Sequence, residues 1–172
     1  MISNKNEAYL LMEKLGAPQR LITHVQLVGE AAALIIDKLG SMNLEFDKQL
    51  VELGAAIHDA GKIKHPSELD GPGSNHEPDG EKMLLDAGVQ PEVARCCMSH
   101  ARFNKMECLL EELLVALSDK LWKGKRVNDL EERVIDGVAD RLGKARWDIF
   151  TELDSTFEQI ALSRDERLGR SK

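Results

Sequence analysis

The sequence predicts an all-α protein, a compact single-domain helical bundle with about seven to eight helices, on two observations. Leucine and alanine number 39 residues, whereas the β-branched residues valine, isoleucine and threonine number 21, and β-branched residues are the ones that strands favour. Apolar residues recur at helical spacing along most of the chain, and no Asn-Gly or Asp-Gly turn joins two alternating apolar runs. A chain of 172 residues is also long enough to bury one core.

Eight helices are expected, most of them bounded by residues that begin or end helices. The first stops at Gly16-Ala17-Pro18, the second ends at Gly40, and the third begins near Asp47 and ends around Gly61. A proline stands in the first turn of the fifth helix, where its missing N–H costs nothing. The predicted segments are 7–15, 19–39, 47–61, 76–87, 91–101, 106–123, 130–142 and 147–162.

Two segments are expected to be irregular. Residues 62–75 hold two prolines, two glycines and several polar residues, which predicts a surface loop. The polar tail, about residues 163–172, is expected to be frayed. Because no repeat, low-complexity tract or linker divides the chain, residues 1–172 are interpreted as one domain.

Composition excludes several classes of protein. The net charge of −7 argues against binding to duplex nucleic acid, because proteins that bind duplexes present a basic face to them. The longest apolar run, 113–117, is far shorter than the ~20 residues that cross a bilayer, and the first residues do not resemble a signal peptide. Three cysteines, two of them adjacent, do not form a disulfide framework. A cytoplasmic protein with no membrane partner is therefore expected.

Histidine and aspartate residues in apolar surroundings are the candidates for chemistry. His24 points into the apolar stripe of its predicted helix, and His58 follows an apolar run and is followed at once by Asp59. Asp119 ends a second apolar run, where an unpaired carboxylate would cost several kcal/mol or stay protonated. A metal cation removes that penalty, and imidazole with carboxylate is a ligand mixture typical of transition metals.

Single residues of these kinds have simpler interpretations. A lone histidine is more often structural than a ligand, although His76 and His100 each lie near a helix end between the candidates above. Cys96 and Cys97 precede His100 closely enough to suggest a zinc site, but there is no second cysteine pair and Cys108 stands alone. All three cysteines are therefore interpreted as small core residues.

Five stretches of sequence together resemble the HD-domain superfamily of metal-dependent phosphohydrolases. Three carry its shorter pattern, ITHVQLVGEAA around His24, LGAAIHDAGKI around His58-Asp59 and LLVALSDKLWKGKR around Asp119. Two more, NHEPDGEKMLLDAGV with His76 and VARCCMSHARF with His100, match its longer six-ligand form. The resemblance implies a helical bundle of the HD-domain type whose ligand core spans residues 19–126.

The resemblance implies a centre of one or two divalent transition metal ions. One ion would be held by His24, His58, Asp59 and Asp119. The second would be held by His76 and His100, with the Asp59 carboxylate bridging the two. Imidazole-rich ligation favours Fe, Mn, Co, Ni or Zn over Mg, which prefers oxygen ligands.

The implied reaction is hydrolysis by metal-activated hydroxide, with Asp59 and Lys62 as its catalytic residues. Such a centre lowers the pKa of a bound water and neutralises charge on phosphoryl oxygens. Lys62, four residues after His58, is the candidate for a phosphate or transition-state contact. Its alternative role is that of a solvated lysine at a helix C-terminus, where cations are favoured.

A run of cations follows Asp119 and is a candidate substrate-binding lip. Lys120, Lys123, Lys125 and Arg126 lie within seven residues with no acid between them, and Arg102 and Lys105 after His100 could join them. Such a lip would capture a polyanionic substrate by electrostatic attraction. The alternative, favoured for Lys125 and Arg126, is a solvated helix end whose cations complement the helix dipole.

Several other residues carry weaker expectations. Trp122 and Trp147 are expected to be packing anchors, given how few aromatic residues the chain has. His65 is expected at the surface of its loop. Glu77 and Asp79, beside His76, could contact ligands or substrate, or could simply be acids at a helix N-terminus.

The function favoured by these patterns is cleavage of a phosphoester or phosphoanhydride in a small phosphorylated metabolite, with a nucleotide as the preferred class. One alternative is a di-iron oxygenase of the same superfamily, because ligands alone do not separate the two chemistries. Another is a regulatory HD domain without turnover, against which the complete ligand set argues. The oligomeric state stays open, with a homodimer as one alternative.

Overall fold

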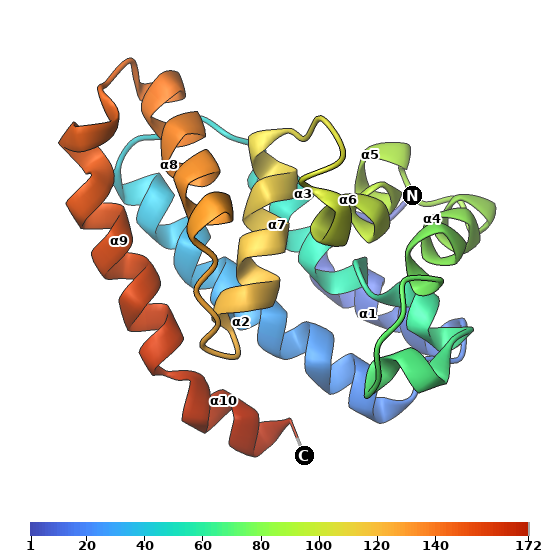
Figure 1. Cartoon of the computed structure of the whole chain (residues 1–172). Coiled ribbons are helices and arrows are strands. Elements are labelled where there is room, and N and C mark those ends of the chain that lie inside the picture. The colour runs from blue at the N-terminus through green and yellow to red at the C-terminus, as the bar shows by residue number, and fades with distance from the viewer. Residues whose placement is uncertain (172) are drawn as a thin grey trace.

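The computed structural model describes residues 1–171, and every regular element in that range is a helix (Figure 1). The all-α prediction is confirmed. Ten α-helices and two short 3₁₀ helices occur in these residues. They are α1 (Lys5–Lys14), α2 (Gln19–Ser41), α3 (Lys48–Ile57), η1 (Ala60–Ile63), η2 (Pro66–Leu69), α4 (His76–Asp86), α5 (Pro91–Ala94), α6 (Cys96–Arg102), α7 (Leu110–Leu121), α8 (Asn128–Leu142), α9 (Arg146–Leu162) and α10 (Arg164–Arg170).

Helix α7 forms the centre of the bundle. It packs against α2, α3, α6, α8 and α9, and Figure 1 shows it between the α8–α9 pair and the smaller helices α4, α5 and α6. Every residue of α7 except Lys120 is buried. The uninterrupted apolar run 113–117 places apolar side chains on all sides of the helix, so this part of α7 has to be covered on all sides.

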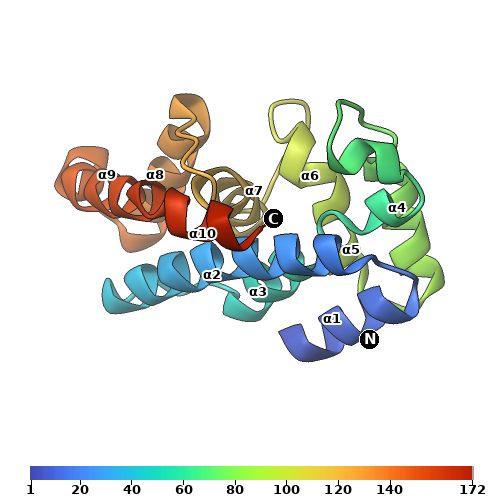
Figure 2. The same ribbon diagram turned by 90° about the horizontal axis from the view of Figure 1, so that it is seen from below.

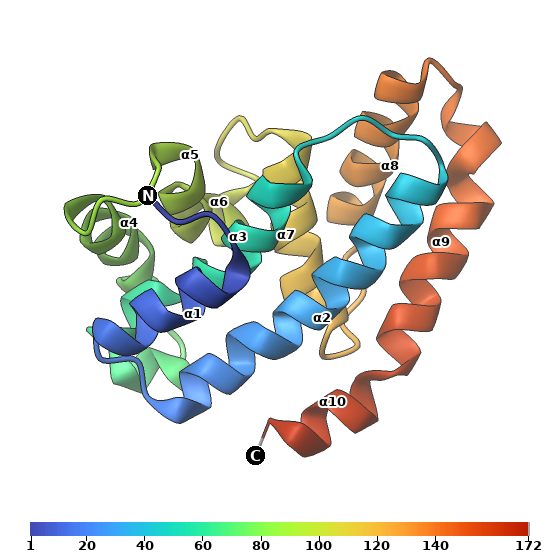
Figure 3. The same ribbon diagram turned by 180° about the vertical axis from the view of Figure 1, so that it is seen from behind.

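Helix α2 is the longest helix and crosses the back of the molecule beside α1 (Figure 3). Its apolar stripe, which includes Leu21, Val25 and Val28, is completely buried against the bundle. Its other face carries exposed polar residues such as Gln26 and Glu30. None of the helices described in residues 1–171 combines the length and the apolar character that crossing a membrane requires.

The chain around Asp59 leaves regular α-helix at the point where the candidate residues stand. Asp47 caps the N-terminus of α3 by accepting a hydrogen bond from the Leu50 N–H at 2.9 Å, as expected for an acid at that position. Helix α3 ends at Ile57, and Asp59 has φ −104° and ψ 16°, outside the helical region. The 3₁₀ turn η1 then begins, so the predicted single helix over 47–61 is instead two elements.

The polar C-terminal tail was expected to be frayed, and this expectation is wrong. Residues Arg164–Arg170 form α10, which lies across α2 and the end of α7 (Figure 2). Arg167 is buried and donates hydrogen bonds to the carbonyl oxygens of Trp122 and Ile160 at 3.3 and 2.7 Å. Arg170 pairs with Glu30 of α2 through two hydrogen bonds. Two of these partners, Trp122 and Glu30, are distant in sequence, so the polar composition of the tail does not reveal them.

Two further expectations need correction. Residues 91–101 form two short helices, α5 and α6, instead of one, and part of the loop 62–75 is organised by η1 and η2. Trp122 is buried as expected, but Trp147 is 73% exposed. Its ring contacts that of Phe150 in a tilted arrangement, with ring centroids 5.4 Å apart, and the Arg146 guanidinium lies 5.9 Å from its centroid. Trp147 precedes the buried Ile149 by two residues, which places it on the opposite face of α9.

Glu111 ties the first turn of α7 to two other parts of the chain. Its buried carboxylate accepts hydrogen bonds from the Arg141 guanidinium of α8 at 2.7 and 3.0 Å, and from the Asp47 N–H at 3.1 Å. Burial by itself would raise the pKa of Glu111, but these hydrogen bonds outweigh it and hold the pKa below its usual value. The carboxylate is therefore ionised at neutral pH and stabilises the junction of α7 and α8.

We expect the substitution Glu111→Gln to lower the free energy of unfolding at pH 7 by about 2 kcal/mol, because it leaves the partly solvated Arg141 without its counter-ion. The folded-state pKa of Glu111 is depressed, so its contribution is complete above the unfolded-state pKa of about 4.3 and is lost as the pH falls through the folded-state value. Urea unfolding at pH 7 and about pH 3 measures this, with the exposed Glu107→Gln as control. An equal loss of stability at both pH values would contradict the prediction.

Candidate metal centre

Six predicted ligands converge on one buried point from five segments of the chain. His24 comes from the second turn of α2 and Asp119 from the last turn of α7. His58 and Asp59 come from the junction of α3 and η1, where the end of the α-helix lets two adjacent side chains point the same way. Two more histidines complete the set. His76 is the first residue of α4, and His100 lies near the end of α6.

The Asp59 carboxylate lies in the middle of the four imidazoles. Its Oδ2 is 2.9 Å from His24 Nε2 and 3.5 Å from His58 Nε2. Its Oδ1 is 3.5 Å from His76 Nε2 and 3.4 Å from His100 Nε2. Each carboxylate oxygen of Asp59 therefore faces a different pair of histidines.

Asp119 completes the group on one side only. Its Oδ1 is 3.3 Å from His58 Nε2 and 3.9 Å from His24 Nε2. The donor atoms thus divide into two groups that share Asp59. The first group is His24, His58, Asp59 and Asp119, and the second is Asp59, His76 and His100.

Three of the imidazoles are oriented by hydrogen bonds at the nitrogen that faces away from Asp59. The Nδ1 of His58 donates to the Ala55 carbonyl oxygen at 2.8 Å, and the Nδ1 of His100 donates to the Cys96 carbonyl oxygen at 2.9 Å. A backbone carbonyl only accepts, so Nδ1 of each ring carries a proton and Nε2 is the nitrogen left to face the centre, where it would offer its lone pair to a bound cation. His76 is held in the same way by Glu68, at 2.8 Å from its Nδ1.

The residues fit a divalent cation on two observations. Two donors of one ion, each about 2.1 Å from it, are at most about 4.2 Å apart, and all the distances from Asp59 and Asp119 to these imidazoles lie within that limit. The Oδ1 of Asp59 is also buried without a hydrogen-bond partner in the described residues. Such an atom is costly unless a cation or a donor approaches it.

The two aspartates are carboxylates and not neutral acids. Burial by itself raises the pKa of Asp59 and of Asp119, but the surrounding imidazoles, His58 foremost, outweigh burial and hold both pKa values well below their usual range. The centre therefore offers two carboxylates and four imidazole nitrogens to a cation. This is the donor set that suits a divalent transition metal.

The predicted substrate-binding residues are divided among several places. Lys62 donates to Asp59 Oδ2 at 3.0 Å and lines a cavity of about 200 Å³ together with His24, Trp122 and the exposed Lys123. Lys120 is half-buried and does not line that cavity.

The remaining predicted cations lie away from that opening. Arg102 donates to the buried Glu77 at 2.7 Å and lines a separate cavity of about 460 Å³ with Lys105. Arg126 bonds to Glu131, Asp154 and Glu158 and joins α8 to α9. Arg126 is thus partly buried among acids of the two following helices, which differs from the solvated helix end favoured for it.

Sequence reasoning missed Glu68, which holds the His76 ring. Glu68 lies in the loop predicted as surface, yet it is buried and accepts hydrogen bonds from both the Nδ1 and the backbone N–H of His76. The only local signal is a neighbouring glycine: a Cβ on Gly73 would lie 2.6 Å from the Glu68 side chain. His65 of the same loop is partly buried and pairs with Asp79 at 2.6 Å.

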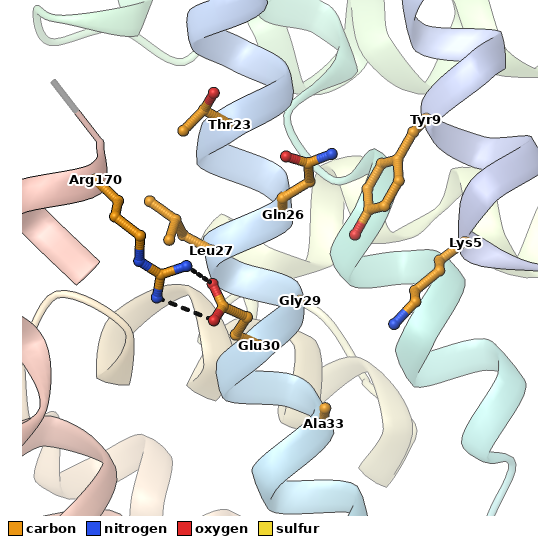
Figure 4. Close-up of a pocket in the computed structure, with 9 residues that line it drawn as sticks. All are labelled: Lys5, Tyr9, Thr23, Gln26, Leu27, Gly29, Glu30, Ala33 and Arg170. Atoms are coloured by element: carbon orange, nitrogen blue, oxygen red, sulfur yellow. Dashed lines mark hydrogen bonds and ion pairs between the residues drawn. The ribbon is translucent and has the colours of Figure 1, made fainter. Parts of the chain in front are cut away.

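A larger cavity of about 560 Å³ lies apart from the centre, between α1, α2 and α10 (Figure 4). Lys5 and Tyr9 of α1 lie on the side of α2 that carries Gln26, and on the other side of α2 Arg170 of α10 pairs with Glu30. In the part of the chain that the structure describes, the lining of this cavity includes none of the six predicted ligands. Size alone therefore does not identify the site.

The fold and the cluster together define the class of this protein: it is an all-α bundle with a candidate metal centre of histidines and aspartates. A family model described as HD domain matches residues 21–143, which is more than half of the chain, and the chain belongs to the HD domain family. That family lies in a superfamily of metal-dependent hydrolases. The residues matched include all six predicted ligands.

One curated relative is the tRNA (cytidine(56)-2'-O)-methyltransferase of Thermoplasma volcanium. It is 25% identical to this chain, in a match that covers 87% of this chain and 48% of the relative. The chain thus spans about half the length of that protein. No solved structure matches the chain.

Proposed function

We propose that this protein is a metal-dependent phosphohydrolase that cleaves a phosphoester or phosphoanhydride of a small phosphorylated metabolite, with a nucleotide as the preferred class. The observation that carries the proposal is the Asp59-centred cluster, which opens beside Lys62 and Lys123 into a small cavity. Nitrogen and carboxylate donors would hold cations there, and the lysines would face the phosphoryl oxygens of a substrate. Membership of the HD domain family supports the same chemistry.

Divalent ions, when bound, supply a water of lowered pKa and positive charge opposite the phosphoryl oxygens. The chain supplies the remaining parts. His58, His76 and His100 fix their donor positions in advance, since the orientations of these rings are set by the hydrogen bonds described above. Lys62 is tied to Asp59 Oδ2 at 3.0 Å and lies at the edge of the cavity, where its ammonium would donate to a phosphoryl oxygen.

The size of the cavity limits which part of a substrate enters. A volume of about 200 Å³ is smaller than the roughly 300–1,000 Å³ of pockets that enclose a whole small molecule. We therefore place only the phosphate end in the cavity, beside His24 and Lys62, with the remainder of the metabolite beyond its opening. Such a site would act on phosphates that differ in the attached group.

The similarity to a tRNA methyltransferase does not change this proposal. The match covers 48% of that protein, and a net charge of −7 disfavours a long polyanionic partner. A small anion held at one cationic opening is compatible with that net charge. The partner that we propose is accordingly a small phosphorylated molecule.

A screen of metals and substrates tests the function. Metal-free protein is loaded with Mn²⁺, Co²⁺ or Ni²⁺ and assayed for phosphate release from a panel of nucleotides and other phosphorylated metabolites. Turnover that depends on the added metal is the expected result. Oxygen consumption by the iron-loaded protein with no phosphate release from any compound would instead favour the oxygenase alternative and overturn the proposal.

We expect Lys123→Ala to raise the KM for the substrate identified in that screen by about 3- to 10-fold at low salt, with a smaller change in kcat, because an exposed cation at the opening attracts a polyanion. Salt screens such attraction, so the KM of the variant should respond less to added salt. Lys125→Ala, exposed but outside the cavity lining, is the matched control. An unchanged KM at low salt would show that Lys123 is only a solvated helix-end residue.

A further inference from the structure

The small cavity beside the centre is cationic in a protein of acidic composition. It is lined by three cations, Arg20, Lys62 and Lys123, and by no acidic residue in the part of the chain that the structure describes. The cavities of about 460 and 560 Å³ differ in this respect, since Glu77 lines the first and Glu30 the second. Positive charge is thus gathered at this one opening although the whole chain carries a net charge of −7. Such an opening attracts anions.

Arg20 is the one cation of the three that carried no prediction from the sequence. It lies in the first turn of α2, four residues before His24, so the two side chains share a face of the helix. The Arg20 side chain is 58% exposed, whereas the Lys62 side chain, which donates to Asp59, is 15% exposed. Lys62 therefore lies toward the ligands and Arg20 toward solvent.

The guanidinium of Arg20 is paired with Asp70, the residue that follows η2. Both of its terminal nitrogens donate to the Asp70 carboxylate, one to each oxygen. Both side chains are more than half exposed, and an exposed ion pair of this kind contributes little stability. The planar guanidinium matches the oxygens of a phosphate as well as those of a carboxylate. Arg20 can therefore exchange Asp70 for a phosphoryl group at small cost.

We propose that Arg20 forms a subsite for a second anionic group of the substrate, next to the phosphoryl group beside Lys62. This inference rests on the proposed function, and it narrows the substrate to molecules that carry two neighbouring phosphates. The competing interpretation is that Arg20 and Asp70 form only an ion pair that joins α2 to the loop after η2. The two interpretations differ in the effect of neutralising Asp70, which releases a binding group in the first and only breaks a contact in the second.

Anion binding to the manganese-loaded protein separates them. The probes are methylenediphosphonate, whose P–C–P bridge is not hydrolysed, and orthophosphate, each titrated calorimetrically with the same Mn²⁺ concentration in both solutions. We expect Arg20→Gln to bind the diphosphonate about 10-fold more weakly and orthophosphate less than about 3-fold more weakly, because only the diphosphonate reaches the subsite. We expect Asp70→Asn to bind the diphosphonate about 2- to 5-fold more tightly, because its guanidinium no longer has a competing carboxylate.

Arg146→Gln is the matched control, because Arg146 forms a similar two-bonded pair with Asp136 outside the lining of this cavity. It should bind both probes like the unsubstituted protein. Unchanged diphosphonate binding in Arg20→Gln would overturn the proposal, as would equal losses in Arg20→Gln and Asp70→Asn, or no diphosphonate binding by the unsubstituted protein. Absence of phosphate release from every compound of the substrate panel would instead count against the proposed function, and the order of anion affinities would stand as a separate result.

Discussion

Replacement of Asp59 by alanine is expected to abolish both metal retention and phosphate release. This carboxylate is the one donor shared by both groups, and its two oxygens face all four imidazoles at 2.9–3.5 Å. Its loss removes one ligand from each ion position and the negative charge that compensates them. We expect metal affinity to fall by more than about 100-fold, since even residues that only orient a ligand are worth 10- to 100-fold.

The measurements are metal content after gel filtration and phosphate release with saturating Mn²⁺. Asp86→Ala is the matched control, because Asp86 is exposed and pairs only with Lys82 on the same helix. Asp59→Asn, which keeps the size of the side chain, separates loss of the charge from loss of packing. A variant without metal that still turned over at the normal rate would refute the assignment of Asp59.

The substitution Gly61→Ala is expected to lower the free energy of unfolding by about 3 kcal/mol and to weaken metal binding as well. Gly61 of η1 packs directly on α4, and a Cβ there would overlap the backbone carbonyl group of His76. Backbone does not move aside as a flexible side chain does, so η1 and α4 would have to separate. That separation would also pull His76 away from Asp59.

Urea unfolding and a Mn²⁺ titration measure the two effects of Gly61→Ala. Gly169→Ala is a control for the same chemical change, because Gly169 lies within α10 and has no atom within 4 Å of its added Cβ. A helical glycine with free space should gain about 0.5–1 kcal/mol on replacement by alanine. Loss of stability without any change in metal affinity would show that the η1–α4 contact does not position His76.

The apolar pattern explains most of the fold. Helix α7 is covered on all sides around its apolar run 113–117, and α2 buries the apolar stripe of an amphipathic sequence. His24 and Asp119 could be singled out in the same way, as ionisable residues placed on buried faces. The order of these residues along the chain then pointed to the HD domain family, which the family match confirms.

Elements whose stability comes from distant partners were not visible in the sequence. Helix α10 exists because Arg167 binds carbonyl groups of Trp122 and Ile160, and a polar tail carries no mark of such contacts. Trp147 is exposed because α9 presents its other face to the bundle. Residue type alone predicted a buried tryptophan and a frayed end, and both predictions were wrong.

Composition and periodicity therefore determined the class of fold and singled out His24, Asp119 and the His58-Asp59 pair, because these depend on which stretches of the chain are apolar. His76 and His100 were added as ligands only by the resemblance to the HD-domain superfamily. Only the tertiary structure decided which oxygen of Asp59 faces which imidazole and that Glu68 orients the His76 ring. It also decided that Glu77 lies 4.0 Å from His76 and pairs with Arg102. Those facts depend on the distances between segments of the chain. Packing sets such distances, so neither segment's own sequence reveals them.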